Sequence, residues 1–133
     1  MRYDPNIPPV ASEWLALRET DRIAVCERYH RRVRPKPPRI KAHAVIHATI
    51  ETQLAKGIES VVVALNRLQA DGLDRHESIH AIGTVLIERL SEVQLADGRY
   101  DDPVYWYYQA LDRLTVDSWR SKFSPSRDAT DTR

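Results

Sequence analysis

Two stretches of the chain set the expected fold: KAHAVIHATIETQLAKG at residues 41–57 and DRHESIHAIGTVLIERL at residues 74–90. The second has the clearer start signal, because Asp74 and Glu77 match a capping box, in which each side chain binds the other residue's backbone N–H. Its apolar residues follow helical spacing: Ile79, Ile82, Val85, Leu86, Leu90 and Val93. The first stretch ends at Gly57, a residue typical of helix C-termini. Both stretches therefore predict helices.

Further helical patterns lie on either side of these two. They cover residues 19–32, 59–70 and 103–114, with prolines or glycines at their ends. In the second of them, the inward positions are predicted to be Val62, Leu65 and Leu68. Gly83 lies inside the helix predicted to start after Asp74 and costs roughly 1 kcal/mol there relative to alanine. We therefore expect a close helix contact or a ligand at that position.

The predicted fold class is all-α, a single compact bundle of four to five helices joined by short connections. Its helical domain is expected over residues 19–115. Residues 1–18 are predicted to form an extended N-terminal arm, because prolines interrupt the beginning of the chain. Residues 116–133 are predicted to be a C-terminal segment that is partly disordered, because its last residues are polar.

Length, net charge and cysteine content limit the classes of protein to which this chain can belong. The chain has 133 residues, enough for one domain with a hydrophobic core, and a net charge of only +1. This balance gives no global attraction to nucleic acid or to acidic partners. Cys26 is the single cysteine and has no internal disulfide partner. No apolar run suggests a signal peptide or a membrane span, so the prediction is a cytoplasmic protein without membrane contact.

All five histidines lie between residues 30 and 80, and four of them form two His-x-x-x-His pairs. Residues four apart on a helix share one face, so both rings of a pair can reach one ion. Glu51 continues the first pair by one more turn, and His30 lies on the apolar side of the first predicted helix. The expected metal ligands are His30, His43, His47, Glu51, His76 and His80.

Imidazole and carboxylate ligands are typical of sites for a divalent metal ion such as Zn, Fe or Mn, in a mono- or dinuclear centre. Such a centre is compatible with a metal-dependent hydrolase or with oxygen chemistry at iron. A catalytic base for hydrolysis would be Glu51 or Glu77. The alternatives are a buried polar network, a histidine pH switch, or a non-catalytic nucleic-acid- or protein-binding helical module whose histidines are structural.

The pattern resembles a group of uncharacterised bacterial helical domains. The shared elements read Tyr29-His30, then His43 to His47 with Gln53-Leu54, then Arg75-His76 to His80. They cover roughly residues 22–95. This resemblance implies a helical fold with a metal site, and it implies no established activity. In that group the acidic residue after the second histidine is shifted by one position relative to Glu51.

A looser similarity is to hemerythrin-like metal-binding bundles, which use His-x-x-x-Glu and His-x-x-x-His on successive helices. The matching residues are His47 to Glu51, His76 to His80, and His30. That family adds a His-x-x-x-x-Asp pattern on its last helix, whereas residues 103–114 contain no histidine. Dioxygen binding at two irons is therefore only an analogy here.

Two other features bear on partners. Residues 28–41 carry seven basic side chains interrupted by prolines, which predicts a basic loop. Such a loop is compatible with nucleic acid or with steering of an anionic substrate to the site, although a solvated loop is the preferred interpretation. The aromatic block Tyr105–Tyr108 is either a homodimer interface or a half-exposed part of the core. The substrate itself, a small molecule or an anion, is not identified by the sequence.

Overall fold

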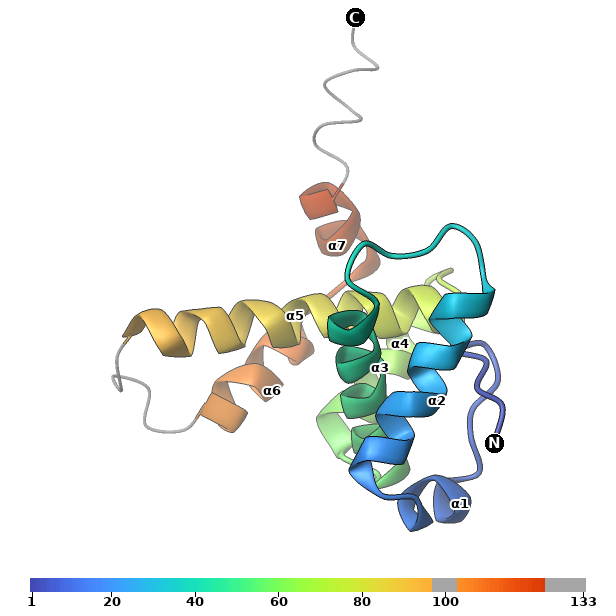
Figure 1. The fold of residues 1–133 in the computed structure, drawn as a ribbon. Helices are drawn as coiled ribbons and strands as arrows, with labels where there is room; N and C mark the ends of the chain where they lie inside the picture. Colours follow the sequence, from blue (N-terminus) through green and yellow to red (C-terminus); the bar gives the residue numbers. More distant parts are fainter. Residues whose placement is uncertain (97–102, 124–133) are drawn as a thin grey trace, which may run out of the picture.

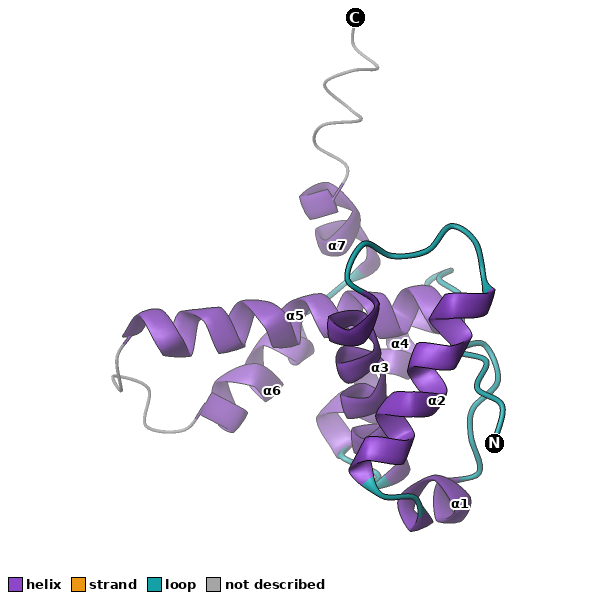
Figure 2. Cartoon of the chain, viewed as in Figure 1, coloured by secondary structure: helices purple, strands orange, loops and turns teal. Residues whose placement is uncertain are grey.

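The computed structural model describes residues 1–96 and 103–123, and of residues 92–96, 103 and 123 it describes the backbone alone. Within these ranges the chain is all-α, as predicted, and contains no strand (Figure 2). The helices are α1 (Ala11–Ala16), α2 (Glu19–Arg32), α3 (Ile40–Ala55), α4 (Glu59–Ala70), α5 (Arg75–Ala96), α6 (Pro103–Arg113) and α7 (Val116–Phe123). None of them combines the length and apolar character that a membrane span requires.

Seven helices are described where the sequence predicted four to five. The five longer ones begin and end within about two residues of their predicted positions. The added ones are short: α1 lies inside residues 1–18, which were expected to be extended, and α7 begins the C-terminal segment. Residues 124–133, for which disorder was predicted, lie outside the described part of the chain.

Helix α3 lies at the centre of the arrangement (Figure 1). It packs along α2 on one side and against α5 on the other, while α1 closes the end of the α2–α3 pair. Helices α4 and α6 pack on α5. Two hydrophobic clusters follow from this order. The larger joins α3, α4, α5 and α6 around Ile50 and Leu68, and the smaller joins the N-terminal residues, α2 and α3 around Trp14 and Cys26.

Two predicted core positions differ in the structure. In α4 the predicted positions Leu65 and Leu68 are buried, but Val62 is only half-buried, because the buried face is centred on Val61 and Ala64 beside them. In α5 the stripe is buried through Val85, but Leu90 is 53% exposed. The outer half of α5 extends beyond the bundle, and α6 lies alongside it (Figure 1). Periodicity alone therefore overestimated how much of α5 is covered.

The glycines confirm the expected turns and explain the close approach of α3 and α5. Gly57 and Gly72 follow α3 and α4 with φ of 70° and 113°, values that favour glycine. A Cβ built on Gly83 would lie 2.7 Å from Cγ2 of Ile46. The absence of a side chain at Gly83 therefore lets α5 approach α3, which is the first of the two alternatives expected at this position, a close helix contact or a ligand. This contact brings together the two helices that carry the His-x-x-x-His pairs.

Replacing Gly83 by alanine is expected to destabilise the protein by about 1–3 kcal/mol, although alanine is the better helix former. The added methyl group would push on Ile46, whose branched side chain has little room to move. Urea unfolding measures the change. The double variant Gly83→Ala, Ile46→Ala removes the obstructing Cγ2 and is expected to recover part of the loss. Equal stability of Gly83→Ala and wild type would contradict the close contact.

Candidate metal centre

The five histidines, far apart in the sequence, meet at one place in the bundle. His30 lies in the last turn of α2, His43 and His47 lie on α3, and His76 and His80 lie in the first turns of α5. The capping box that starts α5 is confirmed: the backbone N–H of Asp74 donates to Glu77 Oε1, and that of Glu77 donates to Asp74 Oδ1. The helix start thereby fixes the position of the second histidine pair.

His47 lies at the middle of this cluster. Its ring centroid lies 4.7–5.2 Å from those of the four other histidines, His30, His43, His76 and His80. The Nε2 atom of His80 lies 3.1 Å from Nε2 of His47 and 3.0 Å from Nε2 of His43. His30 joins them from α2 and His76 from α5. Two sets, His30–His43–His47 and His47–His76–His80, each have nitrogen atoms within 4.8 Å of one another.

One hydrogen bond determines which ring nitrogen of His30 is free to bind an ion. Its Nδ1 lies 2.7 Å from the carbonyl oxygen of Cys26. A carbonyl only accepts, so Nδ1 carries the proton and Nε2 keeps a free lone pair. That Nε2 is buried and has no hydrogen-bond partner, and the same holds for Nε2 of His76. Buried nitrogen atoms without partners are rare in proteins, and binding of an ion is one of their recognised explanations.

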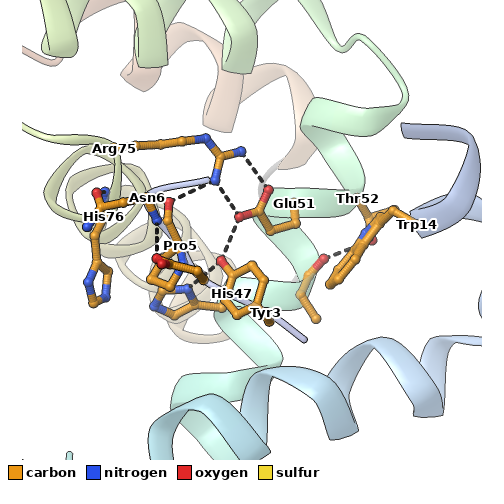
Figure 3. A network of polar contacts seen from close by, with 11 residues as sticks. Tyr3, Pro5, Asn6, Trp14, His47, Glu51, Thr52, Arg75 and His76 are labelled. Carbon is orange, nitrogen blue, oxygen red and sulfur yellow. Dashed lines mark hydrogen bonds and ion pairs between the residues drawn. The ribbon is translucent and has the colours of Figure 1, made fainter. Parts of the chain in front are cut away.

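His47 is fixed by residues outside the histidine cluster (Figure 3). Its Nδ1 lies 3.1 Å from the hydroxyl of Tyr3, and that hydroxyl donates to Glu51 Oε2 over 2.6 Å. The guanidinium of Arg75 donates to both carboxylate oxygens of Glu51, over 2.7 and 2.8 Å. Tyr3, His47, Glu51 and Arg75 are all buried. A buried ion pair thus supports the central histidine.

Glu51, a predicted metal ligand, is therefore placed behind the cluster rather than in it. Both of its oxygens are occupied by Arg75, and one also accepts from Tyr3. Sequence reasoning missed both partners. Arg75 appeared only as part of a helix start, and Tyr3 lies 44 residues from His47 with no local pattern that links them. The shifted acidic position in the resembling bacterial domains was the only sign that Glu51 differs from a plain ligand.

Burial keeps the imidazoles neutral. Together with the neighbouring histidines, it lowers the pKa of His43 to about 4 and that of His80 to about 3. Burial likewise lowers the pKa of His30, His47 and His76. Neutral imidazole is the form that binds metal ions. The cluster is therefore ready for metal binding at neutral pH without the loss of a proton.

The donor set fits a transition metal ion. Imidazole nitrogens bind Zn²⁺ at about 2.0–2.1 Å, so two nitrogens on one tetrahedral ion lie about 3.3 Å apart. The Nε2 separations of 3.0 and 3.1 Å around His80 are a few tenths of an ångström shorter than this spacing. The described residues near this point supply no thiolate or carboxylate to the two sets. The candidate donors in the two sets are thus imidazole nitrogens.

The other two candidate features are less closely connected to this site. The loop between α2 and α3 spans residues 33–39, so part of the predicted basic loop is helical. Arg31 pairs with Glu27, while Arg32 donates to the carbonyl oxygen of Tyr3 and lies over the ring of Tyr29. In the aromatic block on α6, the first two residues are exposed and the third, Tyr107, is buried.

Comparisons with known proteins identify no relative. The sequence matches no family model and no curated protein, and the structure matches no solved structure. The two family resemblances seen in the sequence therefore stay predictions.

Acid is expected to destabilise the metal-free protein between about pH 6.5 and pH 4. The histidine pKa values are lowered in the folded state, so the unfolded chain binds protons first as the pH falls below about 6.5. Stability is fully present above that pH. It is then lost at about 1.4 kcal/mol per pH unit for each histidine that stays neutral only when folded.

Urea unfolding of chelator-treated protein at pH 7.5, 6.5 and 5.5 measures this slope before the carboxylates titrate. A chelated variant that lacks His47 and His80 is the control and should show a shallower slope. A flat profile in the wild-type chain would mean that its histidines are solvated.

Proposed function

We propose that this protein binds one divalent transition metal ion through its histidine cluster and uses that ion as a reactive centre. The observation that carries the proposal is the gathering of five imidazoles centred on His47, in which Nε2 of His80 lies 3.0 Å from Nε2 of His43 and 3.1 Å from Nε2 of His47. His30 and His76 add buried Nε2 atoms that have no hydrogen-bond partner. Two overlapping sets of three imidazoles are therefore available to an ion.

The proposed centre is mononuclear. The two possible ligand sets share His47, and one imidazole nitrogen binds one ion. The second nitrogen of His47 is engaged by Tyr3. A dinuclear centre for oxygen chemistry would need a carboxylate that both ions share, and the carboxylate of Glu51 is taken by Arg75. These contacts favour one ion over the hemerythrin-like alternative.

The ligand type favours zinc or iron over manganese. Neutral imidazole suits Zn, Cu, Ni and Fe, whereas manganese prefers carboxylate and other oxygen ligands. No thiolate joins the set, because the side chain of Cys26 packs in the smaller hydrophobic cluster. A site with only neutral ligands also leaves the full charge of the ion uncompensated. Such an ion is a strong Lewis acid and lowers the pKa of bound water.

A reactive role is favoured over a structural one by what surrounds the cluster. Two hydrophobic clusters and the buried Glu51–Arg75 pair hold the helices together without an ion. His43, His76 and His80 are only half-buried, so the cluster is within reach of solvent. When bound, the ion would supply Lewis acidity for hydrolysis of an ester, amide or phosphate. The chain's own part is to present these rings neutral and fixed.

Elemental analysis of untagged protein, purified without chelator, tests the proposal. We expect about one equivalent of zinc or iron per chain. After chelation the helical circular dichroism signal should remain, with a lower melting temperature because a ligand of the folded state has been removed. Loss of the helical signal would instead indicate a structural ion. No metal, and none taken up on titration, would leave a binding module with structural histidines.

A further inference from the structure

We infer that Tyr3 is a positioning residue for the metal centre, because its hydroxyl joins the central ligand His47 to the buried carboxylate of Glu51. The inference rests on the proposed function and deepens it. It adds to the site a residue from the N-terminal segment, 44 positions away from His47. Figure 3 shows the phenol between the imidazole and the carboxylate.

The direction of the two hydrogen bonds follows from the chemistry of the groups. Glu51 already accepts two hydrogen bonds from Arg75 and is paired as a carboxylate, which can only accept. The single hydroxyl proton of Tyr3 therefore points to Glu51, at the short separation of 2.6 Å. The phenol oxygen then turns its lone pairs to His47, so Nδ1 of His47 must donate. His47 is thereby held with the proton on Nδ1 and a free lone pair on Nε2.

Burial strengthens this assignment. Tyr3 is 2% exposed, and desolvation, together with the charge of Glu51, raises the pKa of its hydroxyl well above the ordinary value. The phenol thus keeps its proton at any physiological pH. Water does not compete for these hydrogen bonds, because Glu51 and His47 are buried as well. The hydrogen-bonded chain from His47 through Tyr3 to Glu51 therefore has one proton arrangement.

The backbone around Tyr3 is held in place from two helices. Arg32 of α2 donates to the carbonyl oxygen of Tyr3 over 2.7 Å. Arg75 donates to the carbonyl oxygen of Pro5 over 2.9 Å, and the side chain of Asn6 accepts from the backbone N–H of His76. The segment from Tyr3 to Asn6 thus links α2 and the start of α5 beside the histidines. This anchoring lets a residue near the chain end act as a fixed support.

Such a support has a known physical effect on metal ligands. A carboxylate or similar acceptor behind a ligating histidine fixes its tautomer and orientation and raises its basicity toward the ion. Removal of such a partner weakens metal binding by about 10–100-fold. We expect this loss for Tyr3→Phe, because phenylalanine fills the same space and lacks only the hydroxyl.

The matched control is Tyr107→Phe. Tyr107 is also buried and its hydroxyl also donates to a side chain, Gln53, over 2.8 Å, but it belongs to the larger hydrophobic cluster. Both variants lose one buried hydroxyl and one donated hydrogen bond. Titration of chelated protein with Co²⁺, followed by its visible absorption bands and by competition with a chelator, measures the affinity. Tyr3→Phe should bind about 10–100-fold more weakly with shifted bands, and Tyr107→Phe should bind as the wild type does.

A second measurement needs no variant of Tyr3. Long-range ¹H–¹⁵N NMR correlations of chelated wild-type protein report which nitrogen of His47 carries the proton, with the signal assigned by its absence in a variant lacking His47. We expect the proton on Nδ1. A proton on Nε2, or equal Co²⁺ affinity in Tyr3→Phe and wild type, would overturn the role of Tyr3 and leave the metal centre standing. No Co²⁺ binding by the wild-type chain would overturn both.

Discussion

The double variant His47→Ala, His80→Ala is expected to purify without metal and to bind Zn²⁺ more than about 100-fold more weakly than the wild-type chain, since it loses ligands rather than their supports. His80 lies between two other Nε2 atoms, and His47 is common to both possible ligand sets. Removing both leaves one histidine from each of α2 and α5 and one on α3. The three that remain, His30, His43 and His76, come from three different helices, and the central ring of His47 is no longer between them.

The control for this experiment is Cys26→Ala. Cys26 is fully buried one turn before His30, so its truncation also creates a small cavity near the cluster. Its thiol has a raised pKa because it is desolvated, and a protonated thiol is a poor ligand. We expect wild-type metal content in this variant. Equal metal in the double variant and the wild type would mean that the ion binds elsewhere, and the proposed centre would be wrong.

Local signals in the sequence were sufficient to predict most of the fold. The capping box of Asp74 and Glu77 starts α5, and Gly57 and Gly72 follow α3 and α4, because these features depend only on neighbours a few residues away. Helix α1 was not predicted, because it lacks such local signals. It has six residues and no side-chain cap, so it depends on the packing of Trp14 rather than on a local signal.

The candidate site was predictable only where its residues share a helix. The spacing within each histidine pair predicted a common face, and the structure brings both faces together. The support behind His47 was not predictable, because it joins Tyr3 to residues of α3 and α5 that are close only after folding. Glu51 shows the limit most clearly. Its spacing after His47 fits a metal ligand as well as it fits a partner in a buried ion pair. The position of Arg75, which the sequence does not give, distinguishes the two roles.

Replacing Glu51 by alanine is expected to cost about 3–5 kcal/mol of unfolding free energy, the largest loss for any single substitution considered for this protein. The side chains of Arg75 and Glu51 are 8% and 1% exposed. Without Glu51 the guanidinium would be a buried charge without its carboxylate partner, although the carbonyl oxygen of Pro5 would still accept from it. The hydroxyl of Tyr3 would lose its acceptor as well. Urea unfolding of chelator-treated protein measures this loss without any contribution from bound metal.

Glu27→Ala is the matched control, because it removes the same side chain from an ion pair at the surface. Arg31 and Glu27 are 61% and 22% exposed, so this pair should contribute less than about 1 kcal/mol. A second comparison separates the charge from the packing. In Glu51→Met, Arg75→Met both charges are absent, and stability should exceed that of Glu51→Ala, because no unpaired ion remains. If chelated Glu51→Ala were as stable as Glu27→Ala, the ion pair would not be the main role of Glu51, and the residue would return as a candidate metal ligand.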